Sequence, residues 1–96
     1  MAKTGSKTYK QLERYFKGVA NHRRISILQL VSRSEGITLD DLSRRLDSNL
    51  KTISEHTRRL VQAGLLNKTY RGRAVAHSLS PYGKKMLACL EIFQHS

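Results

Sequence analysis

Residues 48–62 combine side chains that can bind nucleic acid. Lys and Arg donate to phosphate oxygens and to guanine O6 and N7, Glu accepts from cytosine N4, and Ser or Thr suits several base edges. On a helix with about 100° between residues, the polar side chains of this segment fall opposite Ile53, Thr57 and Leu60. The predicted nucleic-acid contacts of this segment are Ser48, Asn49, Lys51, Thr52, Ser54, Glu55, Arg58 and Arg59.

Taken alone, such a polar face is more often an ordinary solvated helix surface. The neighbouring segments favour nucleic-acid binding over a solvated surface, because a short capped helix precedes this segment and a basic hairpin follows it. This is the order of a helix-turn-helix whose second helix enters the major groove, led by its N-terminal residues. Lys51, Thr52, Ser54 and Glu55 are therefore expected to penetrate deepest, with Arg58 one turn further on.

A basic hairpin is predicted directly after this helix. Residues 65–70 and 74–79 can pair as strands, and Gly72 supplies the turn between them. The predicted contacts are Lys68, Arg71, Gly72 and Arg73, with two guanidinium groups at a narrow tip beside Lys68. Such a tip can follow the phosphate backbone or enter a narrow minor groove. The alternative is a turn whose charge only discourages edge-to-edge pairing of strands.

Capping residues predict the elements that must position these side chains. A first helix is expected over residues 8–17 or slightly beyond, from apolar residues at helical spacing. The expected starts of later helices are Asn21, Thr38 with Asp41 as a capping pair, Ser48 or Asn49, and Ser80 followed by Pro81. Gly36 and Gly64 are expected to end helices. The fold class predicted is α+β: about five helices with a two-stranded antiparallel hairpin.

Length and charge limit the function classes. The 96 residues suit one domain, expected over residues 8–96, with residues 1–7 as a flexible basic tail. Eighteen Lys and Arg against seven acids give a net charge of +11, which favours a polyanionic partner. No apolar run approaches the roughly 18 residues of a membrane span, and no signal-peptide pattern opens the chain. With a single cysteine, Cys89, this pattern predicts a cytoplasmic, nucleoid-associated protein without a membrane partner.

Catalytic and metal-site patterns are missing from the sequence. It contains no glycine-rich phosphate loop, G-x-S-x-G, H-E-x-x-H or paired-cysteine pattern, so an enzyme is not expected. Glu91 and His95 could share a helix face, but two ligands do not make a metal site. We therefore predict no metal and no cofactor, and the sequence identifies no small-molecule effector. His56, His77 and Cys89 are expected to have packing roles.

The terminal helices carry more apolar surface than one thin core needs. A helix–helix homodimer interface is the favoured interpretation, and packing wholly within one subunit is the alternative. The residues predicted to form the interface are Leu12, Phe16, Met86, Leu90 and Phe93.

Several segments resemble the winged helix-turn-helix regulators of the arsenical-repressor (ArsR) type, and the pattern separates them poorly from multiple-antibiotic-resistance (MarR) relatives. The matching segments are Ala20-Asn21-His22-Arg23-Arg24-Ile25-Ser26-Ile27-Leu28, Leu39-Asp40-Asp41-Leu42, Thr52-Ile53-Ser54-Glu55-His56, Arg59-Leu60-Val61-Gln62-Ala63-Gly64-Leu65-Leu66 and Leu79-Ser80-Pro81-Tyr82-Gly83. The resemblance implies a dimeric DNA-binding repressor whose first and last helices form the two-fold interface.

Two departures from that family matter. Metal-sensing members often carry a Cys-x-Cys pair in the first helix of the motif, and residues 39–46 contain no cysteine. Thr57 stands where the family usually has an aliphatic residue, and its hydroxyl is expected to bond back to the Ile53 carbonyl.

The function expected from all of this is sequence-specific binding of double-stranded DNA by a homodimeric transcriptional regulator, acting as a repressor. Two alternatives stay open. One is a non-specific architectural or chromatin-like DNA-binding protein, which the high charge favours. The other is a protein- or RNA-interaction module built on the same fold.

Overall fold

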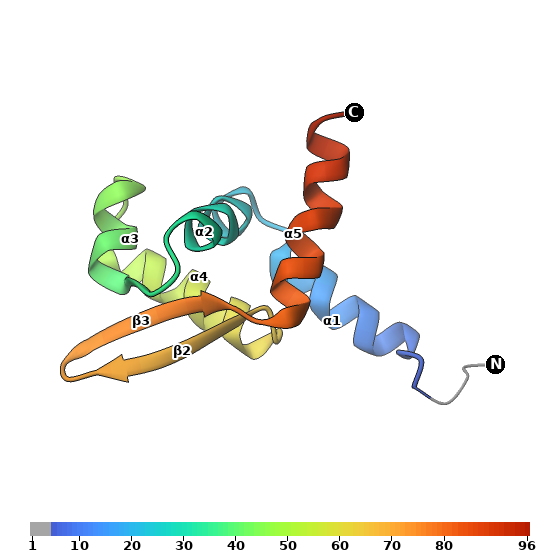
Figure 1. The fold of residues 1–96 in the computed structure, drawn as a ribbon, viewed down its shortest axis with the longest axis horizontal. Coiled ribbons are helices and arrows are strands. Elements are labelled where there is room, and N and C mark those ends of the chain that lie inside the picture. Colours follow the sequence, from blue (N-terminus) through green and yellow to red (C-terminus); the bar gives the residue numbers. More distant parts are fainter. Residues whose placement is uncertain (1–4) are drawn as a thin grey trace.

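The computed structural model describes residues 5–96, and the four residues before them, with Lys3 of the predicted tail, lie outside the described residues. Five helices and three strands follow one another in this part of the chain (Figure 1). They are α1 (Tyr9–Val19), α2 (His22–Arg33), β1 (Ile37–Thr38), α3 (Leu39–Arg45), α4 (Leu50–Gln62), β2 (Leu66–Arg71), β3 (Ala74–Leu79) and α5 (Pro81–Gln94). The predicted α+β winged helix-turn-helix class is confirmed.

Side-chain caps set the helix starts where the sequence predicted them. Each capping oxygen accepts a hydrogen bond from a backbone N–H of the first turn, which has no partner inside the helix. These caps are Asn21 for α2, Thr38 for α3, Asn49 for α4 and Ser80 for α5. Thr8 caps α1 in a reciprocal box with Gln11, a capping box that was not among the predicted helix starts.

The helix ends follow backbone conformation. Gly64, just after α4, has φ +83°, so the predicted left-handed C′ residue is confirmed. α2 ends at Arg33 with Ser34 as its C-cap, slightly before the predicted stop at Gly36, which has φ +88°.

The sheet is antiparallel in the order β1-β3-β2. The β2–β3 register pairs Arg71 with Ala74, which leaves Gly72 and Arg73 as a two-residue loop. A positive φ of 60° at Gly72, the first loop residue, suits a tight hairpin turn, so the predicted hairpin is confirmed. The third strand, β1, was not predicted, because two residues are too few to show an alternating pattern.

The core lies where the helices meet the base of the hairpin. Its fully buried side chains are Ile27, Leu28, Val31, Leu42, Ile53, Leu60, Leu65 and Leu66. Gly83 of α5 lies so close to the Leu65 backbone that a Cβ there would overlap its carbonyl oxygen. This close approach joins α5 to the segment that links α4 with the hairpin.

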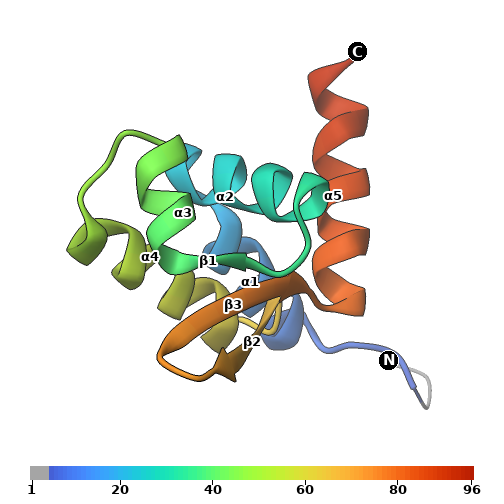
Figure 2. The same cartoon turned by 60° about the vertical axis from the view of Figure 1, so that its left-hand side comes forward.

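The hairpin and the terminal helices occupy opposite sides of the molecule (Figure 1). β2 and β3 extend away from the helices on one side, and α1 extends on the other. The C-terminal end of α5 rises above the other elements in both views (Figures 1 and 2), and its Gln94 side chain accepts a hydrogen bond from Gln29 of α2 at 2.8 Å. The exposed side of α4 and the hairpin therefore form one surface of the molecule, and the exposed sides of α1 and α5 form another.

Candidate nucleic-acid interface

α4 has one buried side and one exposed side. Ile53 and Leu60 have no exposed surface and Thr57 is 4% exposed. The opposite side is polar: Lys51, Ser54, Arg58 and Arg59 are exposed, and Thr52 and Glu55 are half-buried. The predicted orientation of this helix is confirmed, whereas its contacts with DNA stay a prediction.

The turn between α3 and α4 holds the start of α4 firmly. The Asn49 side chain accepts from the Thr52 N–H at 2.8 Å, so it is engaged in capping. The Ser48 carbonyl accepts a hydrogen bond from the hydroxyl of Ser43 in α3. Both predicted contact residues thus have structural partners and lie beside the N-terminal turn of α4, the part expected to enter a groove first.

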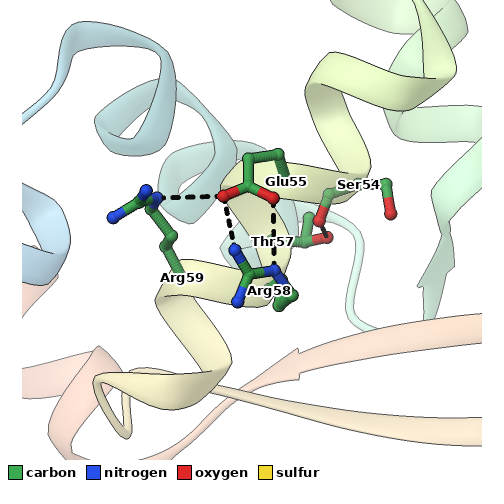
Figure 3. Close-up of polar contacts among 5 residues, drawn as sticks. All are labelled: Ser54, Glu55, Thr57, Arg58 and Arg59. Atoms are coloured by element: carbon green, nitrogen blue, oxygen red, sulfur yellow. Dashed lines mark hydrogen bonds and ion pairs between the residues drawn. The ribbon is translucent and has the colours of Figure 1, made fainter.

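Glu55 is bonded to both arginines of the next turn (Figure 3). Its carboxylate accepts from Arg58 Nε at 3.2 Å and Nη2 at 2.5 Å, and from Arg59 Nε at 3.1 Å. The hydrogen bond from Arg58, more than any other contact, lowers the pKa of Glu55. The polar face therefore carries one carboxylate paired with two guanidiniums.

The Thr57 hydroxyl donates to the Ser54 carbonyl at 3.0 Å, and Figure 3 shows the two side by side. The expectation that it bonds to the Ile53 carbonyl is wrong, because the hydroxyl reaches three residues back rather than four. The hydroxyl is nevertheless satisfied inside the helix, which explains how threonine is tolerated at this buried position.

The hairpin divides its cations between two faces. Lys68 and Tyr70 line a groove shared with Ser54 and Arg58 of α4. Arg71 lies on the other face, where its Nη2 is 3.7 Å from the position of a Cβ on Gly36. Of the two guanidiniums predicted at the tip beside Lys68, that of Arg71 thus lies on the opposite face from Lys68, because side chains alternate along a strand and these two residues are three apart.

The hairpin tip remains open to solvent. Gly72 and Arg73 are exposed, and a Cβ on Gly72 would meet no atom within 4 Å. Arg73 is therefore a solvent-exposed cation at the very tip of the hairpin. The exposed Lys68 adds a second cation on the side of the hairpin that faces α4.

Arg24 and His56 lie beside this site and were not among the predicted site residues. Arg24 Nε and His56 Nδ1 are both buried and have no hydrogen-bond partner among the described residues. Burial and the nearby Arg24 and Arg23 guanidiniums lower the pKa of His56, which favours the neutral imidazole. The pair Arg23-Arg24 after the Asn21 cap was the available sequence signal.

His77 lies in the centre of β3, where its backbone pairs with both Ile37 and Lys68. The side chain is 2% exposed, and its Nδ1 has no partner among the described residues. Burial lowers the pKa of this histidine. The predicted packing role of His77 is confirmed.

The terminal helices present apolar side chains to solvent. Phe16 is 51% exposed, Leu12 41% and Phe93 76%, while Leu90 is half-buried against the core. Met86 is 6% exposed and belongs to the subunit's own core, so it is not part of this face.

Neither a metal cluster nor a bilayer-spanning helix occurs in the part of the chain that the structure describes. Within residues 5–96, no three His, Cys, Asp or Glu side chains gather to hold a metal ion. The described helices are all too short or too polar to cross a bilayer.

Comparisons with known proteins agree with this architecture. A family model described as the MarR family matches residues 20–71, which span the helix-turn-helix and the first strand of the hairpin. No curated protein sequence gives a significant match.

Solved structures show the same fold over nearly the whole chain. HlyU from Vibrio cholerae N16961 is 26% identical, with all of both chains covered and a TM-score of 0.81. Mb0332 from Mycobacterium bovis is described as a possible ArsR-family regulator, and the structure is of its homodimeric winged helix-turn-helix DNA-binding domain. That domain is 20% identical, with 99% of this chain and 91% of that chain covered and a TM-score of 0.82. A structure of MarR is 17% identical, covering 88% of this chain and 65% of that chain, with a TM-score of 0.77.

Proposed function

The chain belongs to the MarR family, whose winged helix-turn-helix members are DNA-binding transcriptional regulators, and from this premise we propose that it binds specific sequences in double-stranded DNA. The observation that carries the proposal is the division of α4. Ile53 and Leu60 anchor one side in the core, and the other side exposes Lys51, Ser54 and Arg58 to solvent. In this proposal α4 lies in the major groove, as the second helix of such motifs does.

The hairpin supports the same placement. Lys68 and Arg58 line one groove between the hairpin and α4, and Arg73 occupies the tip. A duplex that received α4 in its major groove would bring a phosphate backbone or the adjacent minor groove to this tip. Arg73 would then add affinity for any sequence, while the α4 side chains would supply discrimination among sequences.

We further propose that the protein acts as a homodimer through α1 and α5. Phe16, Phe93 and Ile92 each expose half or more of their surface on these helices, which is unusual for a stable small monomer. A second copy would cover them by a two-fold contact of like surfaces. The Mb0332 domain, which has the same fold, is described as homodimeric.

A symmetric dimer would present two copies of α4 to half-sites about one helical turn, ~34 Å, apart. A dimer bound in this way would cover the promoter that holds the half-sites, so repression by occlusion is the mode we propose. Selection of bound duplexes from a random pool tests this directly. We expect an enriched palindrome with half-sites spaced by about ten base pairs, and a pool that stays random would contradict sequence-specific reading.

One observation favours a second candidate, a non-specific architectural DNA-binding protein. The net charge of +11 supplies more cations than a few base contacts require. Salt titration separates the two candidates, because non-specific binding is almost wholly electrostatic. Equal affinity for selected and random duplexes at every salt concentration would establish the architectural role.

A further inference from the structure

Glu55 is the single acidic residue of α4, and it lies in the middle of the polar face. Its two oxygens accept three hydrogen bonds, two from Arg58 and one from Arg59. Both arginines are exposed, so water could solvate them without this carboxylate. The ion pairs therefore do not serve to satisfy buried charge; they bring two guanidiniums to one carboxylate on the exposed side of α4.

The surroundings of Glu55 are otherwise cationic. Burial lowers the pKa of Arg24 on α2, and the positive charge of Arg59 lowers it further. The negative charge of Glu55 opposes that shift. His56, the next residue, is half-buried beside the same Arg24. Glu55 is thus the one carboxylate that α4 places near three arginines, and it is hydrogen-bonded to two of them, Arg58 and Arg59. A surface intended only to hold phosphates would gain affinity by losing that carboxylate, because it repels phosphate.

We propose that Glu55 is a specificity-determining residue, which holds Arg58 and Arg59 in place and makes α4 reject duplexes that offer its carboxylate no amino group. This inference rests on the proposed function. In the major groove, the cytosine N4 and adenine N6 amino groups are the donors that a carboxylate can accept. In a duplex with such a donor at this position, the amino group supplies a hydrogen bond in place of the one from water that the carboxylate loses. A duplex without such a donor leaves the Oε1 lone pair that the arginines do not use without a partner, close to phosphates, which is a penalty against wrong sequences.

The test compares wild type and Glu55→Gln on the selected duplex and on random duplexes, over a range of salt concentrations. Glutamine keeps the size of the side chain but removes its charge. We expect the affinity for random duplexes to rise several-fold. The salt slope on them, which is the slope of log K against the logarithm of the salt concentration, should steepen by about 0.9, because one cation is no longer neutralised by Glu55. Discrimination between selected and random duplexes should fall by at least about fivefold, the low end for one base contact.

A second variant separates charge from position. Glu55→Asp keeps the carboxylate but is one methylene shorter, so it cannot hold both arginines as Glu55 does. We expect its affinity for random duplexes to stay within about twofold of wild type, while its discrimination falls. Glu13→Gln is the matched control, because Glu13 also forms an i,i+4 ion pair, with Lys17 at 3.3 Å, but lies on α1. It should leave both measurements unchanged.

Two results would overturn the proposal. One is an equal gain of Glu55→Gln on selected and random duplexes, which would make Glu55 a mere source of repulsion. The other is a Glu55→Gln protein with wild-type affinities and salt slope. If Glu55→Gln fails to fold, as judged by its thermal transition, the proposal is tested by Glu55→Asp, and unchanged discrimination between selected and random duplexes in that variant would overturn it. A wild-type protein that does not bind duplex DNA at all would contradict the proposed function itself, which is a separate outcome.

Discussion

Ser80 and Gly64 connect the end of α4 to the start of α5. The Ser80 hydroxyl donates to the Gly64 carbonyl at 2.6 Å and accepts from the Gly83 N–H at 2.9 Å. The same residue's N–H donates to the Leu65 carbonyl at 3.2 Å. One buried serine thus links the proposed reading helix to the proposed dimer helix at the base of the hairpin, where Leu66 pairs with Leu79.

Ser80→Ala should therefore lower the free energy of unfolding by about 2 kcal/mol. The change removes an N-cap and leaves the Gly64 carbonyl without its hydroxyl donor. Urea unfolding followed by circular dichroism measures the loss. Ser32→Ala, at an exposed position of α2, is the control and should stay within about 0.5 kcal/mol of wild type. Equal stability of the two variants would show that this connection contributes little.

Thr57→Val should leave the protein as stable as wild type or raise its free energy of unfolding by up to about 1 kcal/mol. The Thr57 hydroxyl is buried, and the Ser54 carbonyl that it contacts is also available to the helix ladder. Replacing the hydroxyl by a methyl group removes a polar atom from the core without orphaning a partner. A loss greater than 1 kcal/mol, measured by the same urea titration, would mean that the bond to Ser54 is needed.

Stability should decrease as the pH falls below about 6.5, the ordinary histidine pKa from which burial lowers the pKa of His77. In the window between the lowered and the ordinary pKa, the unfolded chain binds a proton that the folded chain does not, so acid favours unfolding. The slope for one such group cannot exceed about 1.4 kcal/mol per pH unit. His56 is shifted in the same direction, first by burial and then by Arg24, and adds to the effect.

Urea titrations between pH 7.5 and 5 check this dependence. His77→Gln should reduce the slope, whereas His95→Gln, at the exposed C-terminal end, should keep it. A wild-type stability that is flat over this range, or a His77→Gln curve parallel to wild type, would contradict the assignment to buried histidine.

Arg73→Ala should weaken binding to all duplexes and reduce the magnitude of the salt slope by about 0.9, because one phosphate contact is lost. Arg71→Ala should have the smaller effect, since its guanidinium lies toward Gly36 on the other face of the hairpin. Lys10→Ala on α1 is the charge-matched control. Anisotropy titrations at several salt concentrations give the slopes, and a larger effect of Arg71 than of Arg73 would reverse our assignment of the wing.

The sequence predicted the features that depend on local chemistry. Asn21, Thr38 and Ser80 could be identified as caps because a short polar side chain satisfies the N–H groups two or three residues ahead of it, whatever the tertiary structure. The buried side of α4 could be predicted because Ile53 and Leu60 share one face of any helix. These local rules were sufficient for the class of fold.

Features that depend on distant contacts were predicted less well. β1 exists because Ile37 and Thr38 meet His77 and Ala76 across the sheet, and two residues carry no pattern of their own. Met86 shares its helical spacing with exposed residues, so only the packed structure shows that it is buried. By contrast, the pairs of Glu55 with Arg58 and Arg59 lie at i,i+3 and i,i+4, so the spacing rule could have indicated them.

The most direct test of the central claim is the effect of Arg58→Ala and Lys51→Ala on discrimination between the selected and random duplexes. Both side chains are exposed on α4, opposite the residues that anchor it, so each variant should fold normally. If α4 reads the major groove, the loss of a base contact should weaken binding to the selected duplex by about 1–3 kcal/mol and relax its sequence preference. Folded variants of both residues that keep wild-type affinity and preference for the selected duplex would contradict the placement of α4 in the groove.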